Sequence, residues 1–214
     1  MRVDAKAEGM SVAIGGWSPA AGADGQICTW SSSWFSIVLT ESSAPWAFYK
    51  GLPAKAISAL ELLASTVGLM VLTPAALGTP GAAGSVSITG LTDSQVSTHV
   101  VTRGLSTSFP LCAVAMELSA QLEARECELH LDWVPRDQNA QADALADGKF
   151  QGFSPCRRVP VDFAKVRWLV LDRLMAHGQK CHAELLRAKA GNRRARKDAQ
   201  PRRRSDRLRD RDPL

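Results

Sequence analysis

Alternating hydrophobic and polar residues predict β-strands in five short segments of the chain. These segments are residues 2–4, 11–17, 34–39, 85–91 and 128–134. Gly9 marks the turn between the first two. In the last segment, Leu129, Leu131 and Trp133 alternate with polar residues, the pattern of a strand with one buried face. Residues 46–49 are expected either to pair with the third strand or to cover an edge of the sheet.

Helical spacing of hydrophobic residues separates these strands. The helices are expected at residues 54–72, at 94–104, from Pro110 onward, and from an N-cap at Asn139 to about Asp147. An amphipathic helix over 162–175 and a further helical stretch over 181–190 follow. Three early strands, a helix, a strand, two helices, a strand and a helix indicate an α/β protein with a mixed sheet and helices on its faces.

The 214 residues divide into three parts by composition. Residues 1–148 suit one folded domain, residues 149–186 form a helical extension, and residues 187–214 form a basic tail. The tail holds 12 Lys and Arg residues against 4 acidic ones, whereas the rest of the chain has a slight excess of acids. The tail is expected to be disordered. It is a solvated charge run, a nucleic-acid-binding segment or a nuclear localisation signal.

Neither a membrane span nor a structural zinc site fits the sequence. The apolar run 57–72 has only 16 residues, contains Glu61 and is followed by Pro74, so a buried helix fits better than a span of about 20 residues. The 5 cysteines are scattered, which favours a reducing, intracellular compartment. His177, Cys181 and His182 lack a second ligand pair, so zinc is not expected.

Four carboxylates occupy positions that suit a shared site. Asp4 ends the first predicted strand, Asp93 ends the fourth, and Asp143 lies in the first turns of the late helix. Glu61 lies inside an apolar helix, where a charge is costly unless it is paired, binds a metal or reaches solvent from the helix edge. Clustered acids repel one another unless cations neutralise them, and oxygen ligands favour Mg²⁺ or Mn²⁺. Two such ions can promote phosphodiester hydrolysis.

Four segments together resemble ribonuclease H domains, especially those fused to retrotransposon reverse transcriptases. The segments are Asp4-Ala5, Glu61-Leu62-Leu63-Ala64, Thr92-Asp93-Ser94-Gln95 and Trp133-Val134-Pro135 with Asn139 and Ala142-Asp143-Ala144-Leu145. The resemblance covers about residues 1–148 and preserves the family's Asp–Glu–Asp–Asp order. It implies a five-stranded mixed sheet and cleavage of the RNA strand of RNA/DNA hybrids.

The resemblance also implies a role for each matched residue. Asp4 would bridge two metal ions, Asp143 would hold the ion that activates water, and Glu61 with Asp93 would hold the other. Two residues, Ser58 and Gln95, match positions that approach the hybrid, although a helix cap or a surface polar group explains them equally well. Asn139 matches a position that orients the last helix.

Three departures from the family pattern accompany these matches. Only three residues precede Asp4, fewer than a central strand usually contains, so the chain is expected to be the downstream piece of a retroelement polyprotein or a truncated gene model. The loop Arg136-Asp137-Gln138 lacks the histidine that many family members carry. Residues 18–33 are expected to be an insertion.

Other readings of the chain stay open at the sequence level. The alternative to an active ribonuclease is an inactive nucleic-acid-binding remnant; an integrase-like nuclease lacks these motifs and ranks last. Four tryptophans are expected to lie in the core or to cover the sheet, and not to stack on bases. They are Trp17, Trp30, Trp34 and Trp46. The protein is expected to act inside the cell, in the cytoplasm or the nucleus.

Overall fold

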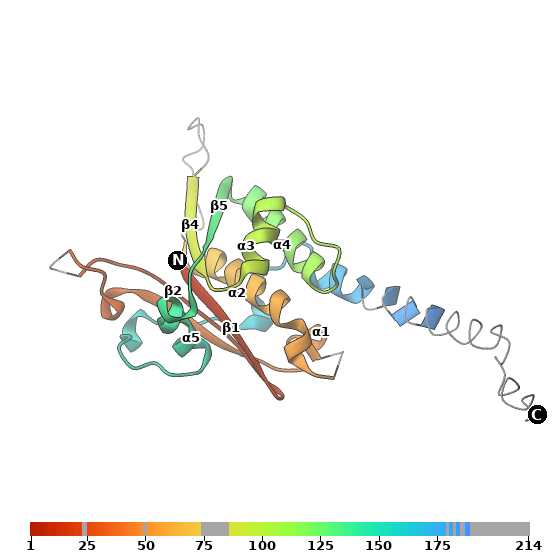
Figure 1. Ribbon diagram of the computed structural model, residues 1–214, viewed down its shortest axis with the longest axis horizontal. Coiled ribbons are helices and arrows are strands. Elements are labelled where there is room, and N and C mark those ends of the chain that lie inside the picture. The colour runs from red at the N-terminus through yellow and green to blue at the C-terminus, as the bar shows by residue number, and fades with distance from the viewer. Residues whose placement is uncertain are drawn as a thin grey trace, which may run out of the picture.

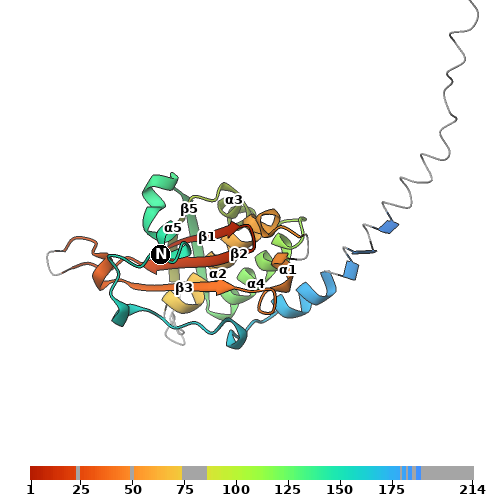
Figure 2. The ribbon, with the colours of Figure 1, turned by 90° about the horizontal axis from the view of Figure 1, so that it is seen from below.

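A five-stranded mixed sheet forms the centre of the molecule in this computed structural model (Figure 1). The structure describes residues 1–22, 25–48, 51–73 and 86–178, together with residues 180, 181, 183, 184, 187 and 188. The strands are β1 (Arg2–Glu8), β2 (Ser11–Ser18), β3 (Ser33–Leu39), β4 (Val86–Thr92) and β5 (Cys127–Trp133), in the order β3-β2-β1-β4-β5. β1, β2 and β3 are antiparallel neighbours (Figure 2), whereas β4 and β5 run parallel to β1.

Helices cover both faces of this sheet. They are α1 (Pro45–Phe48), α2 (Ile57–Leu72), α3 (Gln95–Arg103), α4 (Leu111–Ala124) and α5 (Ala140–Ala146). A β-carbon on Gly15 would lie 2.6 Å from the Ala146 amide nitrogen, so this glycine allows α5 to lie close against β2. A β-carbon on the next residue, Gly16, would instead meet Val3 and Phe35 on the side of α2. The predicted α/β class, with a mixed sheet and helices on both faces, is confirmed.

The first strand is longer than the sequence pattern predicted. It was expected at residues 2–4 but extends to Glu8, because all seven of its residues pair with β2, with Asp4 opposite Gly15. Asp4 therefore lies inside the strand and does not end it. Met1 continues the contact with β4: its carbonyl accepts a hydrogen bond from the Leu91 amide, and its amino group donates one to the Thr89 carbonyl at 2.7 Å.

Two hydrophobic cores lie on the two sides of the sheet. The main core joins β1–β5 to α2 and α4 and includes Trp46. The smaller core lies beneath α5 and contains Trp17, Trp34, Ala142, Leu145 and Phe153. The expectation of buried tryptophans is confirmed for Trp17, Trp34 and Trp46, but it is wrong for Trp30, which is 60% exposed on the 3-10 turn Thr29–Ser31.

Two local predictions are wrong. Residues 46–48 belong to the short helix α1 and do not pair with the third strand, because Trp46, Ala47 and Phe48 all turn into the main core. The helix expected over 162–175 begins only at residue 171, since residues 163–165 form a 3-10 turn that Asp162 caps by accepting a hydrogen bond from the Ala164 amide.

One helical stretch, Pro53–Leu72, is long and apolar enough to cross a membrane by length and composition alone. It comprises the 3-10 turn Pro53–Ala56 and α2, and most of α2 is buried against the sheet and α4. A buried core helix therefore accounts for its hydrophobicity. Residues 74–85, and the predicted tail from residue 189 onward, lie outside the described residues.

Candidate active site

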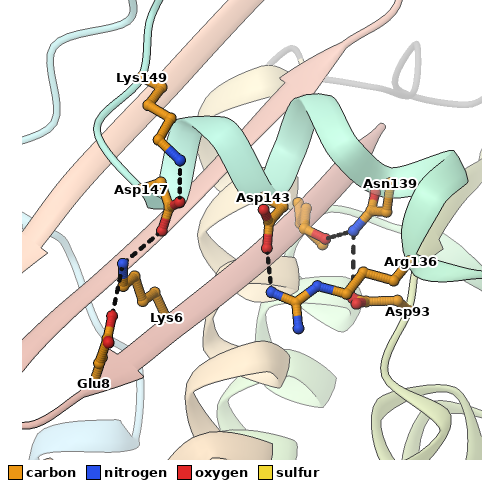
Figure 3. Close-up of polar contacts among 9 residues, drawn as sticks. Lys6, Glu8, Asp93, Arg136, Asn139, Asp143, Asp147 and Lys149 are labelled. Carbon is orange, nitrogen blue, oxygen red and sulfur yellow. Dashed lines mark hydrogen bonds and ion pairs between the residues drawn. The ribbon is translucent and has the colours of Figure 1, made fainter.

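The four predicted carboxylates line one open pocket of about 450 Å³. Each comes from a different part of the fold: Asp4 from β1, Glu61 from α2, Asp93 from the turn after β4, and Asp143 from α5. The remaining lining residues are Ala5, Lys6, Ala7, Glu8, Ile57, Arg136 and Asp147. Residues far apart in the sequence thus meet at one site (Figure 3).

The sheet topology explains why these carboxylates meet. β1 and β4 are parallel neighbours, so Asp93, just beyond the carboxyl end of β4, emerges beside Asp4. Asp4 lies on the face that α5 covers, and the missing side chain of Gly15 lets α5 bring Asp143 close to it. Glu61 lies on the second turn of α2, which starts beside the pocket at Ile57.

Asp4 is the most perturbed acid of the site. It is 6% exposed, and burial together with the negative charges of Asp93, Asp143 and Glu61 raises its pKa to about 8, although a hydrogen bond from the Ala5 backbone opposes the shift. The pKa of Glu61 is also raised, mainly by burial, with Asp93 adding to the shift and a Ser94 hydrogen bond opposing it. The pocket therefore resists carrying its full negative charge without a cation.

Three of the carboxylates are held by neighbouring side chains. The Ser94 hydroxyl donates to Glu61 Oε2 at 2.5 Å and also accepts from the Ser97 amide as the N-cap of α3. Asn139 Nδ2 donates to Asp93 Oδ1 at 3.4 Å. Arg136 Nη2 donates to Asp143 Oδ1 at 2.5 Å. These contacts fix the carboxylates in place before any ligand binds.

Asn139 connects the site to the central strand. It stands at the predicted N-cap position of α5, but its side chain makes no capping hydrogen bond. It is fully buried and donates to the Val3 carbonyl at 3.0 Å as well as to Asp93, while its own Oδ1 has no partner. The prediction of side-chain capping is therefore wrong, because tertiary contacts with β1 and Asp93 engage the amide.

A separate group of charges lies at the other end of the pocket. Asp147, at the C-terminal end of α5, contacts Lys6 Nζ at 2.7 Å and Lys149 Nζ at 2.8 Å (Figure 3). These hydrogen bonds lower the pKa of Asp147. Lys6 also contacts Glu8 at 3.0 Å. These lysines neutralise Asp147 and Glu8, and no ion pair joins them to the four predicted carboxylates within the described part of the chain.

The donor set of the pocket fits a hard divalent cation. Its four converging carboxylates offer only oxygen ligands, and their mutual repulsion would be relieved by a cation. Within the described residues, however, no three acidic, histidine or cysteine side chains are placed so that they could hold a metal ion together.

The predicted substrate-contact residues lie around the site and not in its lining. Ser58 is half-buried on α2, one turn before Glu61, and Gln95 is exposed as the first residue of α3. Their proposed contact with a hybrid stays a prediction. Sequence reasoning gave no role to Arg136, Ser94 or Asp147; the only local signal was that Ser94 adjoins Asp93 and that Arg136 belongs to the loop before the last helix.

Comparison with known proteins yields structural likenesses only. No family model matches the chain, and no curated protein matches it. Similar solved structures include RNase H1 from the halophilic archaeon Halobacterium salinarum (20% identity, 69% of this chain, 93% of that chain, TM-score 0.39). An N-terminal RNase H domain from Mycobacterium tuberculosis is similar at 18% identity, with 69% and 92% coverage and a TM-score of 0.37.

A third structure, LC11-RNase H1 in complex with an RNA/DNA hybrid, shares 16% identity over 69% of this chain and 92% of that chain, with a TM-score of 0.43. All three TM-scores are below 0.5, so these likenesses decide neither the fold nor the activity of this chain. The fold assignment rests on the strand order, the strand directions and the placement of α2 and α5 on opposite faces.

Proposed function

We propose that this protein is a divalent-metal-dependent endonuclease that hydrolyses the RNA strand of RNA/DNA hybrids. The observation that carries the proposal is the meeting of Asp4, Glu61, Asp93 and Asp143 in one pocket, in the residue order of the ribonuclease H motifs that the sequence resembles. The raised pKa values of Asp4 and Glu61 support it, because burial, together with neighbouring negative charges, disfavours their ionised forms, a cost that a bound cation would relieve.

In this reaction, water attacks the phosphorus of the RNA strand and the 3′ oxygen leaves. Two Mg²⁺ ions, or Mn²⁺ in their place, would supply an activated water and stabilise the leaving oxygen. By the resemblance, Asp4 would bind both ions, Asp143 the ion on the water side, and Glu61 with Asp93 the ion on the leaving-group side.

The surrounding residues would keep these ligands in position during the reaction. The Ser94 hydroxyl limits the freedom of Glu61, and Asn139 ties Asp93 to the backbone of β1. Gln95 and Ser58 are proposed to contact the hybrid beside the pocket. Both lie on helices that begin next to the carboxylates, α3 after Asp93 and α2 before Glu61.

A cleavage assay on an end-labelled RNA/DNA hybrid with Mg²⁺ tests the proposal. We expect Asp93→Asn to reduce cleavage by more than about 100-fold, since even residues that only support metal ligands contribute up to roughly that factor. Asp132→Asn is the matched control, because Asp132 is exposed on β5 and lies outside this pocket. Its activity should equal that of the unchanged protein.

The same assay separates the inactive-remnant alternative from the proposal. Binding of the hybrid without cleavage by the unchanged protein would favour the remnant. Equal cleavage by the unchanged protein and Asp93→Asn would reject this site as the source of activity. A first strand too short to hold Asp4 would favour the remnant, whereas β1 pairs with β2 over seven residues.

We also propose that the protein derives from a retroelement and works with the rest of a retroelement polyprotein inside the cell, in the cytoplasm or the nucleus. The motif resemblance to reverse-transcriptase-linked domains and the basic sequence of residues 187–214 support this proposal. A fractionation experiment with the tagged full chain, and with the chain ending at residue 186, would show where the protein resides and whether the basic segment directs it there.

A further inference from the structure

Arg136 is the only side chain among the described residues that forms an ion pair with one of the four pocket carboxylates. Its Nη2 lies 2.5 Å from Asp143 Oδ1, and the guanidinium contacts this carboxylate from the loop that precedes α5 (Figure 3). The Arg136 side chain is 77% exposed and that of Asp143 is 31% exposed. The pair thus lies at the open side of the pocket, where a ligand from solvent would enter.

A metal ion that binds Asp143 through Oδ1 would compete with the guanidinium for that oxygen. Asp143 Oδ1 cannot keep a short charge-assisted hydrogen bond and also offer its full charge to a cation.

We infer that Arg136 is a built-in counter-ion of the pocket, which a divalent cation must displace from Asp143 before this carboxylate can serve as a ligand. This inference rests on the proposed metal-dependent function. It names Arg136 as the residue that regulates the binding of a metal ion to Asp143. In the ion-free protein, Arg136 neutralises Asp143 beside the buried Asp4. In the ion-bound protein, the metal takes over that role.

The exposure of Arg136 makes such an exchange feasible. Ion pairs at exposed positions are weak, so a divalent ion can displace the arginine at small cost. The released guanidinium stays at the rim of the pocket on a short loop. There its planar set of donors suits a phosphate of a nucleic-acid substrate.

Metal binding by the full chain without nucleic acid tests this inference directly. Mn²⁺ titrations followed by electron paramagnetic resonance would compare the unchanged protein with Arg136→Ala. We expect Arg136→Ala to bind Mn²⁺ roughly three- to fivefold more tightly, the factor that corresponds to removal of one competing exposed ion pair. Mg²⁺ competing for the bound Mn²⁺ should show the same ratio.

A double-mutant cycle distinguishes direct competition from a general loss of positive charge. In an Asp143→Asn background, Arg136→Ala should leave Mn²⁺ affinity unchanged, because the competing contact is already absent. Lys149→Ala is the charge-matched control: Lys149 pairs with Asp147 and is 65% exposed, and its removal should tighten Mn²⁺ binding much less.

Three outcomes would overturn the inference. Equal tightening by Lys149→Ala and Arg136→Ala would assign the effect to overall charge, and a persistent effect in Asp143→Asn would place it elsewhere. Absence of Mn²⁺ binding by both the unchanged protein and Arg136→Ala would also reject it. Hybrid cleavage is measured separately, so a protein that binds Mn²⁺ as expected but cuts no hybrid would contradict the proposed function alone.

Discussion

Asp4 is a carboxyl group that the fold buries among other acids. Burial and the charges of Asp93, Asp143 and Glu61 favour its protonated form and raise its pKa from 3.8 to about 8. Such an arrangement destabilises the ion-free fold whenever Asp4 is ionised. Sites that bind cations commonly carry this cost, because the same charges provide affinity once the cation is present.

The pH dependence of stability follows from this shift. Between about pH 4 and pH 8 the unfolded chain releases a proton that the folded protein retains on Asp4, so folding stability should fall as the pH rises through this range. We expect Asp4→Asn to remove this part of the pH dependence and to stabilise the ion-free protein by about 1–2 kcal/mol at pH 8. Urea unfolding between pH 5 and pH 8.5 in the presence of a chelator would measure both effects.

Asp132→Asn serves as the control for this comparison, because Asp132 is exposed on β5. The prediction concerns the difference in the free energy of unfolding between Asp4→Asn and the unchanged protein, since other groups also titrate in this range. If that difference does not grow from pH 5 to pH 8, Asp4 ionises in the folded protein much as it does in the unfolded chain. Saturating Mg²⁺ should reduce the difference, because binding to the ionised site stabilises the fold.

At the residue scale, the sequence could predict the acids but not their partners. Asp93 and Asp143 stand out because they lie at element ends within recognisable motifs, and Glu61 because its neighbours are apolar. The contact between Ser94 and Glu61 joins residues 33 positions apart, and its existence depends on how α2 and α3 approach each other. Arg136 gave no signal, since an arginine in a polar loop is ordinary.

At the scale of elements, Glu117 connects α4 to the start of the C-terminal helix. It is fully buried, and its two carboxylate oxygens accept hydrogen bonds from the backbone amides of Leu169, Val170 and Leu171 and from Gln121 Nε2, at 2.7–3.0 Å. The helix that begins at residue 171 thus receives its N-terminal cap from a side chain of α4.

This arrangement predicts that replacing one Glu117 oxygen by an NH₂ group lowers the free energy of unfolding substantially. Glu117→Gln would turn an amide NH₂ group toward N–H donors that now share a carboxylate, and buried donors without partners cost roughly 1–3 kcal/mol. We therefore expect a loss of about 2 kcal/mol in the free energy of unfolding, measured by urea denaturation. Glu123→Gln, on the exposed side of the same helix, should change it by less than about 0.5 kcal/mol.

Regular elements were predictable where a periodic pattern continued over many residues. The α2 and α4 helices and β3, β4 and β5 were located from hydrophobic spacing to within a few residues. The α1 helix was missed because it has only four residues, too few for a helical period. The helix expected from Asp162 begins later, because Asp162 caps a 3-10 turn and Glu117 fixes the later helix start. The Glu117 contact joins residues 54 positions apart, so it cannot be read from local sequence.

At the scale of the whole molecule, residues 149–178 pack against the sheet and helices that precede them. Phe150 and Phe153 contact Trp34 in the smaller core, and Trp34 Nε1 donates to the Ser154 carbonyl at 2.8 Å. The chain then passes along the edge strand β3, where the Val159 amide donates to the Trp34 carbonyl. Leu171 and Met175 complete the main core beside Phe163.

The sequence placed the end of the folded domain at residue 148, and these contacts lead to a direct test of that boundary. A chain ending at residue 148 would expose the Trp34 face of the smaller core and leave Glu117 buried without its three backbone donors. Each buried phenylalanine alone contributes about 1.5–3 kcal/mol, a large share of the stability of a typical domain. We therefore expect residues 1–148 to lack a cooperative thermal transition and to bind a hydrophobic dye.

Residues 1–188 should melt cooperatively, because this longer chain keeps the Glu117 contact and both cores. Equal melting temperatures for the two chains would show that the domain folds without the extension, whereas loss of the transition only in the shorter chain would make residues 149–178 part of the same folded unit as the pocket.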